Sequence, residues 1–361
     1  MGGIETHLKL LCGEIRDQVD LEVIVCNSAP ENRHDAMDGV PVTRCAEYLN
    51  QHSTSICPTM PLELSLRSYD VVHFHFPHPM GVMAYLGSRR PKRHSVVVTY
   101  HSDVVRQKRL LKLYAPFMNR VLARAEAIIC TSPNYIESST TLQQFREKCH
   151  VIPYGIDLSQ FHHDAAVEAE VRAIKARYPG PLLIGVGRLI YYKGFEYAIR
   201  GMRDVAAQLM IVGDGPLRSS LEQLARECGV ADRVHFVGEK HNHEIAPYYY
   251  AADAFVFPSI ARSEAFGIVQ LEAMACGRPV LNTNLASGVP FVSRHGESGL
   301  TIEPESPEAF ARGVRELFSD EERLRRFGAA GKARVEREFT KEVMAARTLE
   351  LYRGLEVARS N

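Results

Sequence analysis

The sequence lacks the features that mark several classes of protein. No apolar run approaches the 18 or more residues of a membrane-spanning helix, and the N-terminus has no basic segment followed by an apolar one, as a secretory signal would. The eight cysteines are scattered, without the C-x2-C pairs of a zinc site or the density of a secreted disulfide scaffold. These absences disfavour secretion and membrane spanning, and favour a reducing, cytoplasmic location.

An excess of charge of one sign is also lacking. Lys and Arg together number 43, as do Asp and Glu, so the net charge gives no reason to expect a nucleic acid as partner. Apolar residues make up 45% and charged residues 24%, which is typical of a soluble globular protein. A chain of 361 residues is too long for one ordinary core and fits two domains of roughly 150 residues each, with a cleft between them.

Short runs rich in β-branched residues alternate with helical patterns along the chain. This order predicts two Rossmann-like α/β domains with parallel sheets, residues 1–154 and 155–338, and a helix in 339–361 that crosses back to the first domain. The predicted strands are 21–26, 70–76, 95–100, 127–130 and 150–153 in the first domain, and 182–187, 207–213, 233–238, 254–258 and 279–282 in the second; 306–319 and 321–335 are predicted helices.

The beginning of the chain departs from this pattern. Gly2 and Gly3 lead directly into a predicted helix, with no strand before it. In a doubly wound sheet the first strand is central, and a glycine-rich turn leads from its carboxyl end into the first helix. We therefore expect that the first strand of the N-terminal domain is missing, and that roughly 10–20 further residues precede Met1 in the natural protein.

The strongest chemical signal is the segment 263–273, which follows the predicted strand 254–258. Glu264 falls at the start of a predicted helix and Glu272 about two turns inside it, so both carboxylates can face the crevice at the carboxyl end of the sheet. The backbone amides of Ala265, Phe266 and Gly267 would form a cradle for an anion or a hydroxyl group. Alternatively, Glu264 only favours the helix dipole and Glu272 is a solvated face residue.

A second signal is the glycine-containing turn 185–194 between a predicted strand and a helix. Arg188 and Lys193 can converge there on a diphosphate, Arg as a fork and Lys as a point charge. Alternatively, both are solvated cations in an ordinary turn. The third glycine of a G-x-G-x-x-G fingerprint is absent, since Ile190 stands in its place, and a dinucleotide site is therefore weakly supported.

Histidines lie in or just after predicted strands of both domains. His73 and His75 alternate along one strand and should point to the same side, with His78 just beyond, and His241 and His243 form a second short cluster. Neither set brings an obvious third or fourth ligand in sequence, so we expect no metal. His101 directly follows the strand 95–100 and would face the crevice, although a single histidine there is more often structural than catalytic.

The segment from Arg89 to Arg124 is strongly basic, with ten Lys or Arg residues and one acid, Asp103. Within it, basic residues alternate with apolar ones in the pattern of an amphipathic helix that suits an anionic membrane surface; they are Arg106, Lys108, Arg109, Lys112, Arg120 and Arg124. The simpler interpretation is a solvated helix packed on its own domain.

Taken in order, the motifs GGIETH, TYHSD, VIPYGID, GVGRLIYYKG, SEAFGIVQLEAMACGRPV and HGESGL resemble those of the retaining GT-B glycosyltransferases of family 4 over nearly the whole chain. The resemblance implies that Arg188 and Lys193 bind the diphosphate of a nucleotide-sugar donor and that Glu272 binds its ribose. It further implies that Glu264 holds the sugar hydroxyls, together with the amides of residues 265–267. His101 would touch the sugar, and Gly2 and Gly3 would cap the phosphates.

The segment TYHSDVVRQKRLLKLY further resembles bacterial mannosyl- and rhamnosyltransferases of surface polysaccharide synthesis. This likeness implies a GDP-linked hexose donor, a lipid-linked or oligosaccharide acceptor, and work at the cytoplasmic face of the membrane without a metal cofactor. Two alternatives stay open from the sequence: a sugar-nucleotide 2-epimerase of the same fold, and a non-catalytic nucleotide-sugar or glycan-binding protein.

Overall fold

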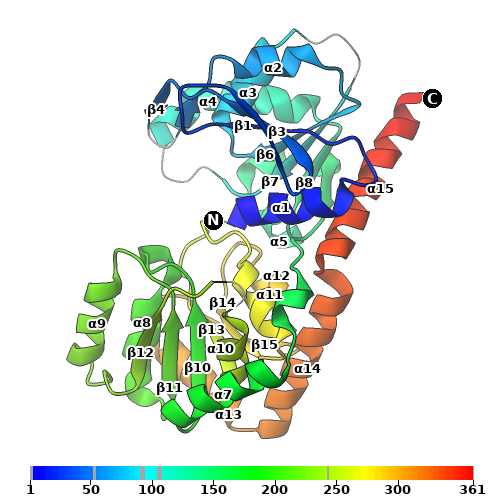
Figure 1. Ribbon diagram of the computed structural model, residues 1–361. Coiled ribbons are helices and arrows are strands. Elements are labelled where there is room, and N and C mark those ends of the chain that lie inside the picture. Colours follow the sequence, from blue (N-terminus) through cyan, green and yellow to red (C-terminus); the bar gives the residue numbers. More distant parts are fainter. Residues whose placement is uncertain (1–2, 52–53, 90–93, 104–107, 242–243, 361) are drawn as a thin grey trace. The chain divides into compact units, whose positions relative to one another are not determined.

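The computed structural model describes residues 3–51, 54–89, 94–103, 108–241 and 244–360 (Figure 1). The chain folds into two compact units. The N-terminal unit comprises Met1–Gly155 and Lys341–Asn361, and the C-terminal unit comprises Ile156–Thr340. No helix within the described ranges is both long and apolar enough to cross a membrane.

The C-terminal unit is built on one parallel sheet of six strands. Its order is β12-β11-β10-β13-β14-β15, and every neighbouring pair is parallel. The strands are β10 (Leu182–Val186), β11 (Gln208–Val212), β12 (Val234–Gly238), β13 (Ala254–Phe257), β14 (Val280–Thr283) and β15 (Gly299–Ile302). The first five confirm the predicted strands, and β15 was not predicted. The order reverses between β10 and β13, which is the switch point where doubly wound sheets bind ligands.

Helices cover both faces of this sheet. They are α7 (Ala165–Arg177), α8 (Phe195–Gly201), α9 (Arg218–Glu227), α10 (Ala246–Ala251), α11 (Ile268–Ala275), α12 (Val289–Val292), α13 (Pro307–Phe318) and α14 (Glu321–Glu338). The helices α13 and α14 confirm the predicted helices 306–319 and 321–335, and each begins after a side-chain cap. Ser306 accepts a hydrogen bond from the Ala309 amide (3.0 Å), and Asp320 accepts one from the Arg323 amide (3.0 Å).

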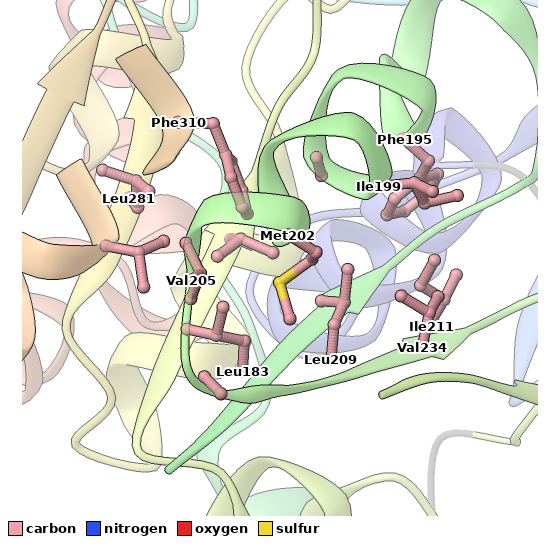
Figure 2. Close-up of a cluster of buried hydrophobic side chains, with 14 of the residues drawn as sticks. Leu183, Phe195, Ile199, Met202, Val205, Leu209, Ile211, Val234, Leu281 and Phe310 are labelled. Atoms are coloured by element: carbon pink, nitrogen blue, oxygen red, sulfur yellow. The ribbon is translucent and has the colours of Figure 1, made fainter. Parts of the chain in front are cut away.

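A core on one side of the sheet holds these elements in place. Figure 2 shows Leu183, Leu209 and Ile211 of the strands packed against helical side chains such as Phe195 and Phe310. All five are buried. Burying each large apolar side chain contributes roughly 1.5–3 kcal/mol to stability. This packing holds the strands of the sheet, and with them the loops that follow β10 and β13.

The N-terminal unit contains two larger sheets and a hairpin. The sheet β6-β7-β8-β9 is parallel, in β1-β3-β2 only the pair β1 and β3 is parallel, and β4 and β5 form an antiparallel pair. The strands are β1 (Val23–Cys26), β2 (Arg33–Met37), β3 (Val40–Cys45), β4 (Leu49–Gln51), β5 (Thr54–Ile56), β6 (Val71–Phe76), β7 (Ser95–Tyr100), β8 (Ala127–Cys130) and β9 (Cys149–Val151). Strands β2 to β5 were not predicted, since their sequence is rich in charged and polar residues.

The helices of this unit are α1 (Gly3–Ile15), α2 (Met60–Leu66), α3 (Pro79–Gly87), α4 (Lys108–Arg124), α5 (Pro133–Ser138), α6 (Thr140–Gln143) and α15 (Lys341–Ser360). Helix α1 is the first described element. The last helix, α15, packs against α1 (Figure 1), with Leu11 and Ile15 of α1 in one buried cluster with Met344 and Leu349 of α15. An ion pair of 3.0 Å between Lys341 and Glu14 adds to this contact.

Candidate active site

The loop that follows β10 touches the loop that follows β13. Gly194 ends the first loop in the left-handed conformation (φ 65°). A Cβ at this position would overlap the carbonyl oxygen of Pro258 and lie 2.8 Å from Cγ2 of Ile260. Only glycine permits both the dihedral angle and this approach. Close packing of the two loops therefore requires Gly194, the last residue of GVGRLIYYKG.

An ion pair joins the two predicted motifs at this contact. The ammonium of Lys193 lies 2.5 Å from Oε2 of Glu264, although 71 residues separate them in the chain. The side chains are only 13% and 12% exposed, and the ammonium also lies 5.1 Å from the ring centre of Phe257. Ser259 donates a weaker hydrogen bond of 3.4 Å to the same carboxylate oxygen. The pair is thus partly shielded from water. Charges attract each other more strongly in such a place than at an open surface.

Arg188 lies in the same loop as Lys193 but differs in its surroundings. Its side chain is exposed. The loop after β10 thus carries one exposed guanidinium and one shielded ammonium. The arrangement suits an anion with two charged groups, as the sequence predicts for a diphosphate.

The segment between Glu264 and α11 is held by buried polar contacts. Gly267 has φ 81°, and a Cβ there would lie 2.7 Å from the Phe257 ring. The Ala265 carbonyl accepts a hydrogen bond from the Gly288 amide (2.8 Å), and the Phe266 carbonyl accepts one from the side chain of Gln270 (3.1 Å). These contacts therefore hold the backbone of Ala265, Phe266 and Gly267 in place.

Gln270 belongs to this framework but was missed from the sequence. It is fully buried, and its Oε1 accepts a hydrogen bond of 2.9 Å from Asn282 of β14. A buried amide needs partners for all its polar atoms, which makes such a network specific in geometry. The available signal was the single polar residue among the apolar residues 268–271.

Glu272 lies on α11 beside another residue that the sequence did not single out. Tyr249 donates a hydrogen bond of 2.8 Å to Oε2 of Glu272. Loss of water around the carboxyl raises the pKa of Glu272 above its usual 4.5, against the opposing effects of Tyr249 and Lys193. Helix α11 begins at Ile268, so Glu264 precedes the helix by four residues and Glu272 lies about one turn inside it, not two.

His101 belongs to the N-terminal unit and is buried there. It follows β7, and its ring accepts or donates at both nitrogens: Nδ1 lies 2.5 Å from the hydroxyl of Tyr154 and Nε2 lies 3.0 Å from Nδ1 of His75. Its pKa lies well below 6.5 because of burial, so the ring is neutral. Gly3 is exposed at the start of α1, and Gly2 lies outside the described residues.

The histidine pair on β6 lies on one side, as predicted. The rings of His73 and His75 are 4.5 Å apart. His78 does not join them, since its Nδ1 accepts a hydrogen bond from the Gly81 amide at the start of α3 (2.8 Å). His243 lies outside the described residues, and Glu244 bonds the backbone of His241 (3.0 Å).

Comparisons with known proteins identify the family of this chain. The model of glycosyl transferases group 1 matches residues 167–334, and that of glycosyltransferase family 4 matches residues 1–160. The chain is 35% identical to O-antigen chain mannosyltransferase C of Escherichia coli over 81% of its length and 77% of the relative. It is also 35% identical to D-rhamnosyltransferase WbpZ of Pseudomonas aeruginosa, over 94% and 89% of the two chains.

Among solved structures, sucrose-phosphate synthase from Thermosynechococcus elongatus superposes with a TM-score of 0.79 at 24% identity, over 99% of this chain and 94% of that one. This likeness shows the GT-B fold. The protein therefore has the GT-B architecture, with two α/β units. The chain belongs to the family 4 glycosyltransferases, and it is a hexosyltransferase.

Proposed function

We propose that this glycosyltransferase moves mannose or rhamnose from a GDP-linked donor to a lipid-linked glycan during surface polysaccharide synthesis. The names of the two relatives, a mannosyltransferase and a rhamnosyltransferase, support the choice of sugar. The observation that carries the proposal is the contact of Lys193 with Glu264, which places a cation and a carboxylate together at the switch point of the sheet.

The charged residues at and near this contact have separate roles in donor binding. Arg188 and Lys193 bind the diphosphate, and Glu272 binds the ribose hydroxyls. When the donor binds, the Lys193 ammonium donates to a phosphate oxygen in place of the Glu264 carboxylate. The carboxylate can then accept hydrogen bonds from the sugar hydroxyls. The amides of Ala265, Phe266 and Gly267 add donors to the same group.

The family resemblance also implies roles for residues of the N-terminal unit. Gly3, together with Gly2, which lies outside the described residues, would cap the donor phosphates, since glycine lets the backbone approach a phosphate closely. His101 contacts the sugar near the reacting carbon. As its ring is neutral and held by His75 and Tyr154, it offers a fixed contact without a charge.

The reaction needs little beyond placement and charge. As the bond from the sugar to the diphosphate breaks, negative charge grows on the leaving phosphate, and Arg188 and Lys193 stabilise it. Two cations do this without a metal ion. The leaving phosphate takes the proton of the acceptor hydroxyl on the same face of the sugar, so the anomeric configuration is retained.

A donor panel tests this proposal. The purified protein is incubated with GDP-, UDP-, ADP- and TDP-linked sugars, and its thermal midpoint is recorded; a ligand at 100 times its Kd adds about 2.7 kcal/mol to the native state. The stabilising donor is then given to the protein with lipid-linked glycans, and the anomeric proton of the product is examined by NMR. We expect a GDP-hexose to bind and an α-linked product from an α-linked donor.

Other outcomes of the same experiment separate the alternatives. An epimerised sugar nucleotide formed without acceptor would indicate the 2-epimerase. Donor binding without any product over the acceptor panel would indicate a non-catalytic binding protein. An inverted product would contradict retention.

Helix α4 supports a further part of the proposal, which is peripheral binding to the inner face of the cytoplasmic membrane. Its buried face includes Met118 and Val121. An exposed stripe runs along the other face, with Leu113 (73% exposed) and Phe117 (43%) followed by Arg120 and Arg124. Apolar side chains next to cations on one exposed face suit an anionic lipid surface. Arg106 lies outside the described residues, as do the side chains of Lys108, Arg109 and Lys112.

Vesicle binding tests the membrane contact. We expect the protein to co-sediment with phosphatidylglycerol vesicles at low salt, and binding to weaken steeply as salt screens the charges. Joint change of Leu113 and Phe117 to Ser should weaken binding at all salt concentrations. The control changes exposed Arg172 and Arg226 of the C-terminal unit to Glu and should bind like wild type. Equal binding to neutral phosphatidylcholine vesicles would refute the electrostatic part.

A further inference from the structure

A buried tyrosine reaches the carboxylate that is proposed to bind the donor's ribose. Tyr249 of α10 has no exposed surface, and its hydroxyl donates a hydrogen bond of 2.8 Å to Oε2 of Glu272 on α11. The two residues are 23 positions apart, so no short motif contains both. The hydroxyl also lies 3.5 Å from the Val269 carbonyl, which is beyond the usual length of such a bond. Glu272 is therefore its main acceptor.

The ring of Tyr249 is packed against aromatic neighbours. Its centre lies 6.3 Å from that of Phe161, which ends a short 3-10 helix, and 6.0 Å from that of Phe255 in β13. Protein interiors are packed closely, so a ring held in this way fixes the place of its hydroxyl as well. Since the loop that carries Glu264 follows β13, the packing ties Tyr249 to the strand from which the candidate site begins.

The Tyr249 hydroxyl is a permanent donor in this contact. Burial and the adjacent Glu272 carboxylate raise the pKa of Tyr249 well above its usual 10, so the phenol keeps its proton at neutral pH. A hydrogen bond to an ionised carboxylate is stronger than one between neutral groups. Tyr249 thus favours the ionised form of Glu272, whereas burial raises the pKa of that carboxyl and favours the neutral form.

Two other titratable groups act on this carboxylate among the described residues. Lys193, in the loop after β10, also lowers the pKa of Glu272, but its ammonium is bonded to Glu264 at 2.5 Å. Cys276 lies one turn further along α11, and burial raises the pKa of its thiol to about 12, so the thiol is neutral. Within the described ranges, Tyr249 is the residue that donates a hydrogen bond to Glu272.

The contact leaves the second oxygen of Glu272 for a ligand. Oε1 has no hydrogen-bond donor among the described residues, and Glu272 retains some exposed surface while Tyr249 has none. Because Tyr249 holds Oε2, the carboxylate does not turn freely, and Oε1 presents its lone pairs in one direction. A fixed acceptor of this kind selects a hydroxyl group by geometry as well as by charge.

We infer that Tyr249 is a positioning residue for ribose recognition, which holds the Glu272 carboxylate in the orientation that binds the ribose hydroxyls. The inference rests on the proposed function, since it takes from there that Glu272 binds the ribose. It adds that the preference for ribose over deoxyribose depends on a buried hydroxyl that does not touch the nucleotide. Loss of a purely structural tyrosine would instead weaken the binding of every nucleotide form alike.

Deoxynucleotides separate these two roles. GDP, 2′-deoxy-GDP and 3′-deoxy-GDP are titrated calorimetrically into the full-length protein, and the same three forms of UDP are titrated in parallel, so that the result does not depend on the base. We expect wild type to bind the ribonucleotide about 10-fold more tightly than at least one deoxy form, as for a hydrogen bond to a charged group. Tyr249→Phe should lower this preference by about 3-fold or more, because the carboxylate is no longer held.

Tyr250→Phe is the matched control. Tyr250 is the next residue of α10, and its hydroxyl donates a hydrogen bond of 2.6 Å to the Phe161 carbonyl. This variant loses one hydroxyl from the same helix and should keep the wild-type preference for ribose. Circular dichroism verifies that both variants are folded.

A double variant tests whether Tyr249 acts through Glu272. In Glu272→Ala the preference for ribose should be lost, and adding Tyr249→Phe should not change it further. A residue that works through a partner has no separate effect once the partner is removed, which is the logic of a double-mutant cycle. A further loss of ribose preference in the double variant would contradict the positioning role.

The pH profile of nucleotide binding provides a second measurement. Glu272 accepts hydrogen bonds from ribose best as a carboxylate, so affinity is full above its pKa and falls as pH drops through it. Loss of the Tyr249 hydroxyl leaves the effect of burial less opposed and raises the pKa of Glu272. The fall should therefore begin at a higher pH in Tyr249→Phe than in wild type or Tyr250→Phe.

The outcomes distinguish this inference from the proposed function. An unchanged ribose preference in Tyr249→Phe, together with its loss in Glu272→Ala, would overturn the positioning role and leave the ribose contact of Glu272 standing. Equal losses in Tyr249→Phe and Tyr250→Phe would also overturn it, since they would reflect the packing of α10. Wild type that binds neither nucleotide would refute the proposed function, and this inference with it.

Discussion

Replacing Gly194 by Ala tests the contact on which the donor site rests. Gly194 has φ 65°, and its Cβ position coincides with the Pro258 carbonyl. A left-handed Ala costs about 1–2 kcal/mol, against which Ala lowers the entropy of the unfolded chain by about 0.4–1 kcal/mol. Relieving the overlap requires the two loops to separate, and overpacking of this kind costs about 1–3 kcal/mol. The sum predicts about 1–5 kcal/mol of destabilisation.

Gly229→Ala is the matched control. Gly229 follows α9 with φ 68°, nearly the same as Gly194, and no described atom lies within 4 Å of its Cβ position. This variant carries the dihedral cost without the overlap, so we expect about 0–1.5 kcal/mol. The difference between the two variants measures the loop contact.

Calorimetry and donor titration provide the two measurements. One kcal/mol shifts the midpoint of a unit of 150–250 residues by about 2–4 °C, so Gly194→Ala should unfold several degrees below Gly229→Ala. Because Lys193 precedes Gly194, separation of the loops also moves its ammonium from Glu264, and donor affinity should fall in Gly194→Ala alone. Equal midpoints and equal donor affinities for the two variants would refute the reasoning.

Three further predictions concern the charged residues of the same site. Glu272→Ala should weaken donor binding while Glu264→Ala mainly lowers kcat, because ribose contacts persist through the reaction and sugar contacts tighten in its transition state; equal loss of both parameters in both variants would contradict these roles. Arg188→Ala and Lys193→Ala should each slow transfer by about 100-fold, and EDTA should leave wild-type transfer unchanged, whereas loss restored by a divalent ion would show that a metal takes part. Burial raises the pKa of Glu272, so the folded state binds the carboxyl proton more tightly than the unfolded state. This proton binding stabilises the fold fully below pH 4.5, and the stabilisation is lost as pH rises through the raised pKa. Glu272→Gln should therefore gain thermal midpoint relative to wild type as pH rises above 4.5, and a constant difference from pH 4 to 8 would be evidence against the raised pKa.

The sequence predicted the elements of the C-terminal unit well because their signals are local. Strands such as 182–187 and 254–258 are continuous apolar runs, as buried parallel strands require. The helices α13 and α14 follow the N-cap residues Ser306 and Asp320. The N-terminal unit was harder. Strands β2 to β5 are short and contain polar, partly exposed residues, and their pairing depends on neighbours that periodicity alone does not identify.

The site divides in the same way. The chain itself determined which residues carry charge and glycine at the strand ends, so Arg188, Lys193, Glu264 and Glu272 were identifiable from motifs of a few residues. Only the tertiary structure decided that Lys193 meets Glu264 across 71 residues. It also decided that Gln270 bonds the Phe266 carbonyl and that Tyr249 bonds Glu272. The physical reason is that residue type and local conformation are properties of short segments, whereas contacts between distant segments exist only after the sheet has fixed which strand ends lie side by side.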